Sequence, residues 1–276
     1  MEYSQEGVND EMEKKKTAKA LKPLDYVKGE PLDGRTVPAV LKYIAATFGV
    51  MVAFLLLGSM MMWNNMFLRV FLNMGLLLFG YLMFYQAGMS SGTIAVNKGE
   101  IVWQRDQTGR ETSAQERREA YHPLKGFVVS LLGSIPVLLI ALGLALTAQK
   151  VLTGAGALPE WLRTLERREE IGSALASYRQ PVGLTLTDVL RLMIRMFLMP
   201  YVNIIGGEGK DALLTLERLS PLLVLIPAVL YGLGYQAGVR IRQRVHAQIE
   251  VGKRKIKRRQ KRENRNRTHK GPERLN

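Results

Sequence analysis

The sequence contains no cysteine and only three histidines. Without cysteine the chain has no disulfide, no thiolate nucleophile, no zinc–thiolate site and no iron–sulfur cluster. His122, His246 and His269 do not have the spacing of a metal-binding motif. A phosphate-binding loop of the P-loop type and an H-E-x-x-H motif are also missing. We therefore expect no metal, no cofactor and no enzymatic activity.

We also expect no secretory signal peptide at the N-terminus. Residues 1–38 are polar and charged, and they lack a short apolar region followed by a small-residue cleavage site. Their composition, with Pro23, Pro31 and Gly34, is typical of a disordered arm. The apolar run that follows is too long for a signal peptide, so we expect it to remain as a membrane anchor.

Long apolar runs are what the sequence has in abundance. Four of them reach the roughly 20 residues that a helix needs to cross a bilayer. A soluble helix is rarely apolar on every side over such a length. We therefore predict an all-α integral membrane protein with four transmembrane helices, at residues 39–63, 66–88, 124–148 and 219–239.

The distribution of charge predicts the topology. Residues 239–276 hold 15 Lys and Arg against 3 Asp and Glu, which is most of the net charge of +15. Basic flanks of membrane helices stay on the cytoplasmic side. This rule places the C-terminus, and with four spans the N-terminus, in the cytoplasm of a bacterial plasma membrane. The turn around residues 63–65 nearly lacks basic residues, as an outer turn should.

Helices and topology together predict seven segments along the chain. They are a disordered cytoplasmic arm (1–38), a first transmembrane hairpin (39–88), a cytoplasmic loop (89–123), a third transmembrane helix (124–148), an extracytoplasmic amphipathic helical segment (149–218), a fourth transmembrane helix (219–239) and a basic cytoplasmic tail (240–276).

Residues 182–206 are apolar enough to be considered as a fifth span. Asp188, Arg191 and Arg195 share one helical face, and a charge at mid-bilayer costs about 2.5–3.5 kcal/mol. We predict instead an amphipathic helix that ends at Pro200 and lies on, or re-enters, the outer leaflet. A surface helix of a small outer domain and a fifth span are the alternatives.

The predicted cytoplasmic loop contains signals for two small elements. Asn97-Lys98-Gly99 lies between Thr93–Val96 and Glu100–Gln104, which predicts a small cytoplasmic β-hairpin. Ser113 and Glu116 have the spacing of a capping box, which predicts the start of a short helix before Pro123.

The motif Y-x-x-x-Y-Q-A-G occurs twice, each time at the end of an apolar run. We interpret it as the end of a helical hairpin that is used twice in the same orientation, as in some transporters. The functional interpretation is a paired polar gate on a pseudo-twofold axis. The structural alternative, which we favour, is an aromatic belt with small residues for helix packing. The candidate residues are Tyr81, Tyr85, Gln86, Gly88, Tyr231, Tyr235, Gln236 and Gly238.

The predicted spans contain few polar side chains. Arg69 and Asn73 are the intramembrane candidates, for snorkelling and for an interhelical hydrogen bond respectively. No predicted span contains Asp or Glu, which counts against ion-coupled transport.

The basic tail is the strongest indication of a partner. It predicts a basic helix that extends the last span and frays after about Lys261, with contacts to anionic lipid or to RNA, including the ribosome. It has no aromatic residue for base stacking. The tail also fits a plain topology anchor. The candidate contact residues are Lys253, Arg254, Lys255, Lys257, Arg258, Arg259, Lys261 and Arg262.

Taken together, these features favour a multipass scaffold or accessory subunit of a membrane complex. Its expected partners are the lipid bilayer and other membrane subunits, with a homo-oligomer as a further form. The alternative is a small transporter or channel formed by two pseudo-symmetric hairpins.

Overall fold

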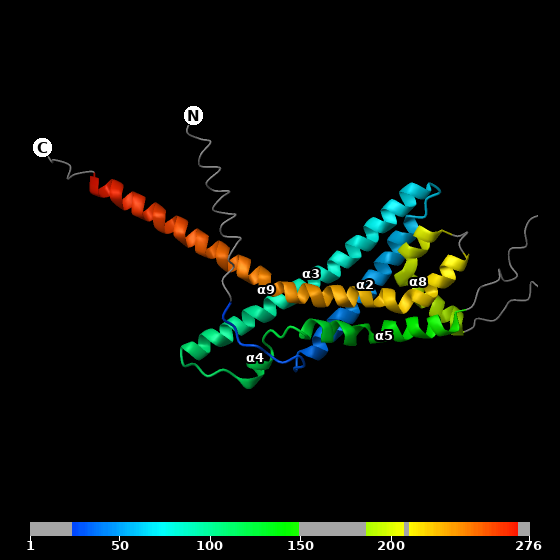
Figure 1. The fold of residues 1–276 in the computed structure, drawn as a ribbon, viewed down its shortest axis with the longest axis horizontal. Coiled ribbons are helices and arrows are strands. Elements are labelled where there is room, and N and C mark those ends of the chain that lie inside the picture. The colour runs from blue at the N-terminus through cyan, green and yellow to red at the C-terminus, as the bar shows by residue number, and fades with distance from the viewer. Residues whose placement is uncertain (1–23, 149–185, 207–209, 270–276) are drawn as a thin grey trace, which may run out of the picture. The chain divides into compact units, whose positions relative to one another are not determined.

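The computed structural model describes residues 24–148, 186–206 and 210–269. Within them the chain forms helices and no strand, which confirms the predicted all-α class. The helices are α2 (Thr36–Met60), α3 (Met66–Gln107), α4 (Ala114–Arg118), α5 (Lys125–Thr147), α8 (Leu186–Ile205) and α9 (Lys210–His269) (Figure 1). The first 23 residues of the predicted arm, and residues 149–185 and 207–209 of the predicted outer segment, lie outside the described residues.

Four of these helices are long and apolar enough to cross a membrane. They are α2, α3, α5 and, over Asp211–Asn264, α9. Each overlaps one of the four predicted spans, and together they indicate a multipass membrane protein. α8 carries three charges in its first half and is not among these helices.

Contacts divide the chain into two compact units. The apolar unit consists of Thr36–Tyr85 and Phe127–Tyr231. The polar unit consists of Met1–Arg35, Gln86–Gly126 and Gly232–Asn276. Because α3 and α9 are continuous, each of them contributes to both units.

The apolar unit packs its helices through aromatic and aliphatic side chains. One core cluster includes Tyr43, Phe54, Phe84 and Tyr231, and the ring of Tyr43 meets that of Tyr231 edge to face at 5.3 Å. A second core cluster joins α5, α8 and α9. Large apolar side chains nevertheless remain exposed on every one of the four long helices, among them Phe48, Phe71, Leu139 and Leu222. Apolar exposure on this scale fits helices that face lipid.

The link between α2 and α3 is the tight turn expected from the sequence. It covers residues 61–65, and Asn65 Oδ1 accepts a hydrogen bond from the Leu68 amide at 3.3 Å. This bond satisfies one of the free amides at the start of α3.

The predicted β-hairpin at 93–104 is wrong, because α3 continues through it to Gln107. The three residues taken as its turn have tertiary partners instead. The Asn97 side chain accepts a bond from Arg242, Lys98 pairs with Glu119, and the Gly99 carbonyl accepts a bond from the Val27 amide. An added Cβ on Gly99 would lie 2.8 Å from the Val27 carbonyl oxygen, so the glycine provides space and not a turn.

The predicted capping box is confirmed. Ser113 is the N-cap of α4 and accepts a bond from the Gln115 amide at 3.2 Å, while Glu116 reaches back to the Ser113 amide. The helix has only five residues and ends at Arg118.

The predicted helix near 182–206 is present as α8, but its predicted end at Pro200 is wrong. α8 continues for five residues beyond this proline, to Ile205. Pro200 is buried, and Asn203 on the next turn donates hydrogen bonds to the Gly58 carbonyl at 2.7 Å and to the Asn73 side chain at 3.0 Å. These contacts hold a turn that the proline weakens by removing one backbone bond.

An extended segment, residues 24–35, packs in the polar unit and is called the strap below. Its amides donate to carbonyls of that unit: Val27 to Gly99 at 3.2 Å, Gly29 to Tyr121 at 3.0 Å and Glu30 to Arg118 at 3.1 Å. A Cβ on Gly29 would lie 2.3 Å from the Ala120 carbonyl oxygen, so only glycine allows this approach.

Candidate functional site

The most distinctive surface of the described chain is the distal part of α9. This helix runs without interruption from an apolar segment into a basic one (Figure 1). The predicted fraying after Lys261 is wrong, since the helix extends to His269. The basic arm is defined here as residues 247–264, and all eight cations named in the sequence analysis are exposed on it.

The cations of the basic arm surround most of the helix. A residue advances about 100° around an α-helix, so the eight Lys and Arg between 253 and 262 span an arc of roughly 240°. Ile256 and Gln260 occupy the remaining sector, and Ile249 projects to the same side about two turns before Ile256. Ile249 and Ile256 are 49% and 60% exposed. The arm therefore has a broad cationic surface and a narrow apolar stripe.

A buried carboxylate binds the part of α9 that directly precedes the basic arm. Glu100, on the distal part of α3, is 5% exposed. Arg242 donates to it from Nε at 2.9 Å and also donates to Asn97 at 2.8 Å. His246 Nε2 lies 3.1 Å from the same carboxylate. Sequence analysis did not single out Glu100, because nothing local marks a carboxylate that pairs with residues more than 140 positions away.

One to two turns before Glu100 and Arg242 in the sequence, α3 and α9 cross with their backbones in contact. A Cβ on Gly92 would lie 2.1 Å from the Tyr235 carbonyl oxygen, and a Cβ on Gly238 would lie 2.5 Å from the Thr93 amide nitrogen. The ring of Tyr235 stacks on that of Tyr121 at 5.3 Å. Burial raises the pKa of Tyr121 to about 12. The residues of the second Y-Q-A-G copy thus lie at the crossing of α3 and α9, before the basic arm begins.

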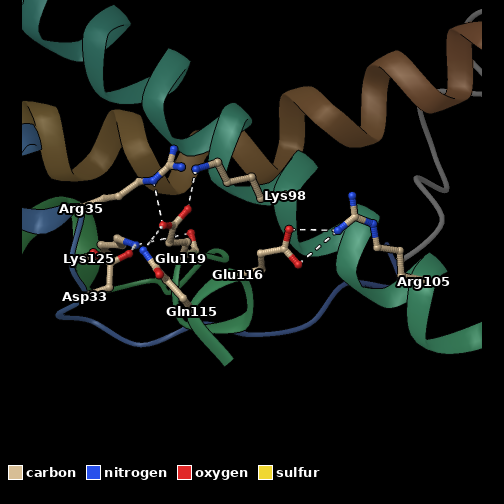
Figure 2. Close-up of polar contacts among 8 residues, drawn as sticks. All are labelled: Asp33, Arg35, Lys98, Arg105, Gln115, Glu116, Glu119 and Lys125. Carbon is tan, nitrogen blue, oxygen red and sulfur yellow. Dashed lines mark hydrogen bonds and ion pairs between the residues drawn. The ribbon is translucent and has the colours of Figure 1, made fainter. Parts of the chain in front are cut away.

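A network of ion pairs joins the strap to the rest of the polar unit (Figure 2). Glu119 is nearly buried and pairs with Lys98 at 3.0 Å and with Arg35 of the strap at 2.8 Å. Lys125, the first residue of α5, pairs with Asp33 at 2.7 Å. Burial alone raises the pKa of Glu119, but the hydrogen bond and charge of Lys98, followed by Arg35, lower it to a net value below the usual one. The carboxylate therefore stays charged and holds the strap.

The two intramembrane candidates, Asn73 and Arg69, have different surroundings. Asn73 is fully buried and donates to the Arg69 carbonyl at 2.8 Å and to the Met61 carbonyl at 3.4 Å, while its own oxygen accepts the bond from Asn203. Arg69 lies one turn away, with its guanidinium beside Gly206 at the end of α8. Asn73 thus joins α3, α8 and the turn after α2.

An ion pair in the apolar unit was not predicted. Arg191 donates two hydrogen bonds to Glu217, at 2.7 and 3.0 Å, and their side chains are 10% and 8% exposed. Arg195 approaches the same carboxylate at 3.7 Å. The sequence indicated the charged face of α8 but assigned Glu217 to the extracytoplasmic segment 149–218, although it belongs to α9, which begins at Lys210.

The two copies of the repeated motif have different contacts. The hydroxyl of Tyr81 bonds to that of Tyr201, whereas Tyr231 packs against Tyr43. Tyr85 is partly buried and Gln86 is exposed. Gln236 is exposed too, and its amide donates to the Pro123 carbonyl at 3.4 Å. Gly88 and Gly238 are both buried. The contacts therefore give no support to a twofold arrangement of the motif.

No metal centre accompanies these features in the described residues. Across 24–148, 186–206 and 210–269, no three His, Asp or Glu side chains gather so as to hold a metal ion. A surface hollow of about 570 Å³ lies between α3 and α4, and Asp106 and Arg117, which line it, bond to each other at 2.8 Å.

Comparison with known proteins finds no matching family model, no matching curated protein and no matching solved structure.

Proposed function

We propose that this chain is a scaffold or accessory subunit of a membrane complex. In this proposal both termini face the cytoplasm of a bacterial plasma membrane, and the basic arm contacts phosphate groups of anionic lipid or RNA. The proposal rests on one observation above all: a single helix, α9, carries an apolar segment able to cross a membrane and then an exposed basic segment. The cations of the basic arm thus belong to the same helix as the membrane anchor.

The contacts of α9 directly before the basic arm support the same proposal. Glu100 binds Arg242 and lies beside His246, and the glycine crossing fixes α3 against α9 just before them. These contacts keep the first turns of the arm helical, so that its cations are presented in a fixed pattern. Preorganisation of this kind lowers the entropic cost of binding.

Partners that copurify with the chain test the scaffold. The full chain and a variant that lacks residues 253–276 are purified from native membranes in mild detergent, and their partners and bound nucleic acid or lipid are compared. We expect the full chain to retain partners that the variant loses. The same partners on both proteins would contradict a role of the basic arm.

The alternative, a transporter or channel, would require the repeated polar side chains to line a path. The contacts of Tyr81 with Tyr201 and of Tyr235 with Tyr121 support a packing role for them instead. Replacement of Tyr85, Gln86, Tyr235 and Gln236 together separates these possibilities. We expect reduced thermal stability in detergent, whereas a stable variant that abolishes ion or solute flux in vesicles would favour the transporter.

A further inference from the structure

We infer that the ligand of the basic arm is the phosphate backbone of a nucleic-acid duplex and not the headgroups of the bilayer. This inference rests on the proposed function, because it names the partner of the same helix. Four properties of the arm support it: its distance from the membrane, the distribution of its cations, its small apolar surface and its lack of aromatic residues.

The distance follows from the continuity of α9. Arg240 is the first charge after the apolar segment, so the membrane boundary lies at or before it. With a rise of 1.5 Å per residue, Lys253 is about 20 Å and Arg262 about 33 Å further along the helix. At a tilt of 40°, the upper end for membrane helices, these heights fall only to about 15 and 25 Å.

Attraction to anionic lipid does not extend this far. At physiological ionic strength charges are screened over about 8 Å, and the surface potential of a bilayer decays over the same distance. Gly252 is the sole glycine of the arm, and α9 remains helical through it, so no break folds the arm back. The cations are therefore too distant to act on the membrane from which the helix emerges.

The distribution of cations around the arm also favours a duplex over a bilayer. A flat bilayer touches one side of a helix, and cations on the other sides gain nothing from it. The phosphates that border a groove of a duplex lie on two sides of a helix that enters it, and the major groove of B-form DNA is wide enough to admit one. An arc of roughly 240° of cations fits such a surrounding better than a plane.

The uncharged residues of the arm argue against two other modes of binding, which are insertion into lipid and binding of single-stranded nucleic acid. Two exposed isoleucines, Ile249 and Ile256, provide little area for insertion into lipid. Single-stranded nucleic acid is usually held by stacking of bases on aromatic rings. Residues 239–276 contain no Phe, Tyr or Trp, so the arm is suited to phosphates and not to bases. Binding of this kind is independent of sequence and strongly dependent on salt.

The test uses the full chain in nanodiscs of zwitterionic lipid, with 20-base-pair RNA and DNA duplexes and a single-stranded RNA as probes. Two variants carry the same change of charge on different sides of the arm: K253Q/K257Q/K261Q and R254Q/R258Q/R262Q. We expect salt-dependent binding of a duplex, weakened by both variants. Each variant removes three cations, and each contact with a phosphate contributes about 0.9 to the slope of log K against log salt. Each variant should therefore reduce this slope by about 2 to 3.

A label on the arm tests the bilayer directly. The chain has no cysteine, so Gln260→Cys provides a single site for a spin label. In nanodiscs rich in anionic lipid we expect the label to remain as accessible to a water-soluble relaxation agent as in zwitterionic lipid.

The outcomes separate the inference from the proposed function. Binding of duplex RNA or duplex DNA supports the inference, and the stronger of the two identifies the source of the phosphates. A label that becomes protected by anionic lipid, without duplex binding, overturns the inference but leaves a phosphate-binding scaffold. Equal or tighter binding of the single strand, or loss of binding in only one variant, also overturns it. An arm that binds neither duplex nor lipid refutes both.

Discussion

Single residues show how a chain with long apolar helices accommodates buried charge. Arg191 and Glu217 are nearly buried in the apolar unit and satisfy each other through two hydrogen bonds. Such a pair adds little net stability, but a single partner left behind is costly. The pair therefore specifies how α8 docks on α9.

Glu217→Gln tests this docking. We expect a loss of about 3 kcal/mol, because the guanidinium of Arg191 loses its buried counter-charge and keeps only the partly exposed Asp188 at 3.4 Å. Thermal unfolding of the detergent-solubilised protein measures it. The double variant Arg191→Met/Glu217→Met should recover much of the loss, and Arg195→Gln, whose side chain is 49% exposed, serves as the control. A Glu217→Gln protein as stable as the parent would show that the pair is not a docking contact.

Glu119 makes the strap sensitive to acid. Because its pKa is lowered in the folded protein, the stabilisation is complete above about pH 5 and is lost as the pH falls below about 4. Hydrogen exchange of the strap amides Val27 and Gly29, corrected for intrinsic rates, should report this loss.

The matching substitution is Glu119→Gln. At neutral pH it should speed exchange of the strap by the equivalent of about 2 kcal/mol and remove the acid transition. Glu30→Gln is the control, since the pair of Glu30 with Arg118 is more than half exposed and should contribute less than about 1 kcal/mol. An acid transition that persists in Glu119→Gln would assign it to another group.

At the scale of elements, the glycines of α3 and α9 are not equivalent. Gly92 faces the backbone of Tyr235, which cannot move aside as a flexible side chain can. Gly252 has no neighbour within 4 Å of an added Cβ.

We expect Gly92→Ala to destabilise the polar unit by about 2 to 3 kcal/mol through overpacking. Gly252→Ala, the same change on an exposed helix, should be stabilising by about 0.5 to 1 kcal/mol. Thermal unfolding of the two variants side by side makes the comparison. Equal effects would mean that the crossing of α3 and α9 is looser than its geometry indicates.

The elements also show what a single sequence can predict. The four apolar helices and the capping box of α4 were predictable, because composition and local hydrogen bonding determine them. The hairpin at 93–104 was not, because Asn97 and Gly99 carry the local signal of a turn but serve contacts with Arg242 and Val27. The pairing of Arg191 with Glu217 depends on distant segments, which no local pattern specifies.

At the scale of the whole molecule, the proposed topology predicts the reactivity of single cysteines in a chain that has none. Asn64→Cys, in the turn after α2, should react with a membrane-impermeant maleimide in intact cells. Gln107→Cys and Gln260→Cys should react only after the membrane is permeabilised, because the positive-inside rule places both on the cytoplasmic side. All three positions are exposed, so a difference reports the side of the membrane and not burial. Labelling of Gln260→Cys in intact cells would contradict the proposed topology, because it would place the basic arm outside the cell.

The strap has a consequence for synthesis of the chain. It is synthesised before its partners, because the carbonyls that accept hydrogen bonds from its amides belong to residues 99, 118 and 121. The polar unit is complete only when Tyr235 covers Tyr121 and Arg242 neutralises Glu100, and both Tyr235 and Arg242 belong to α9, which is synthesised after the other segments of the unit that they contact. A prematurely terminated chain would leave a buried carboxylate and an aromatic face open to solvent. Completion of the last helix thus separates a finished protein from a fragment that proteases can recognise.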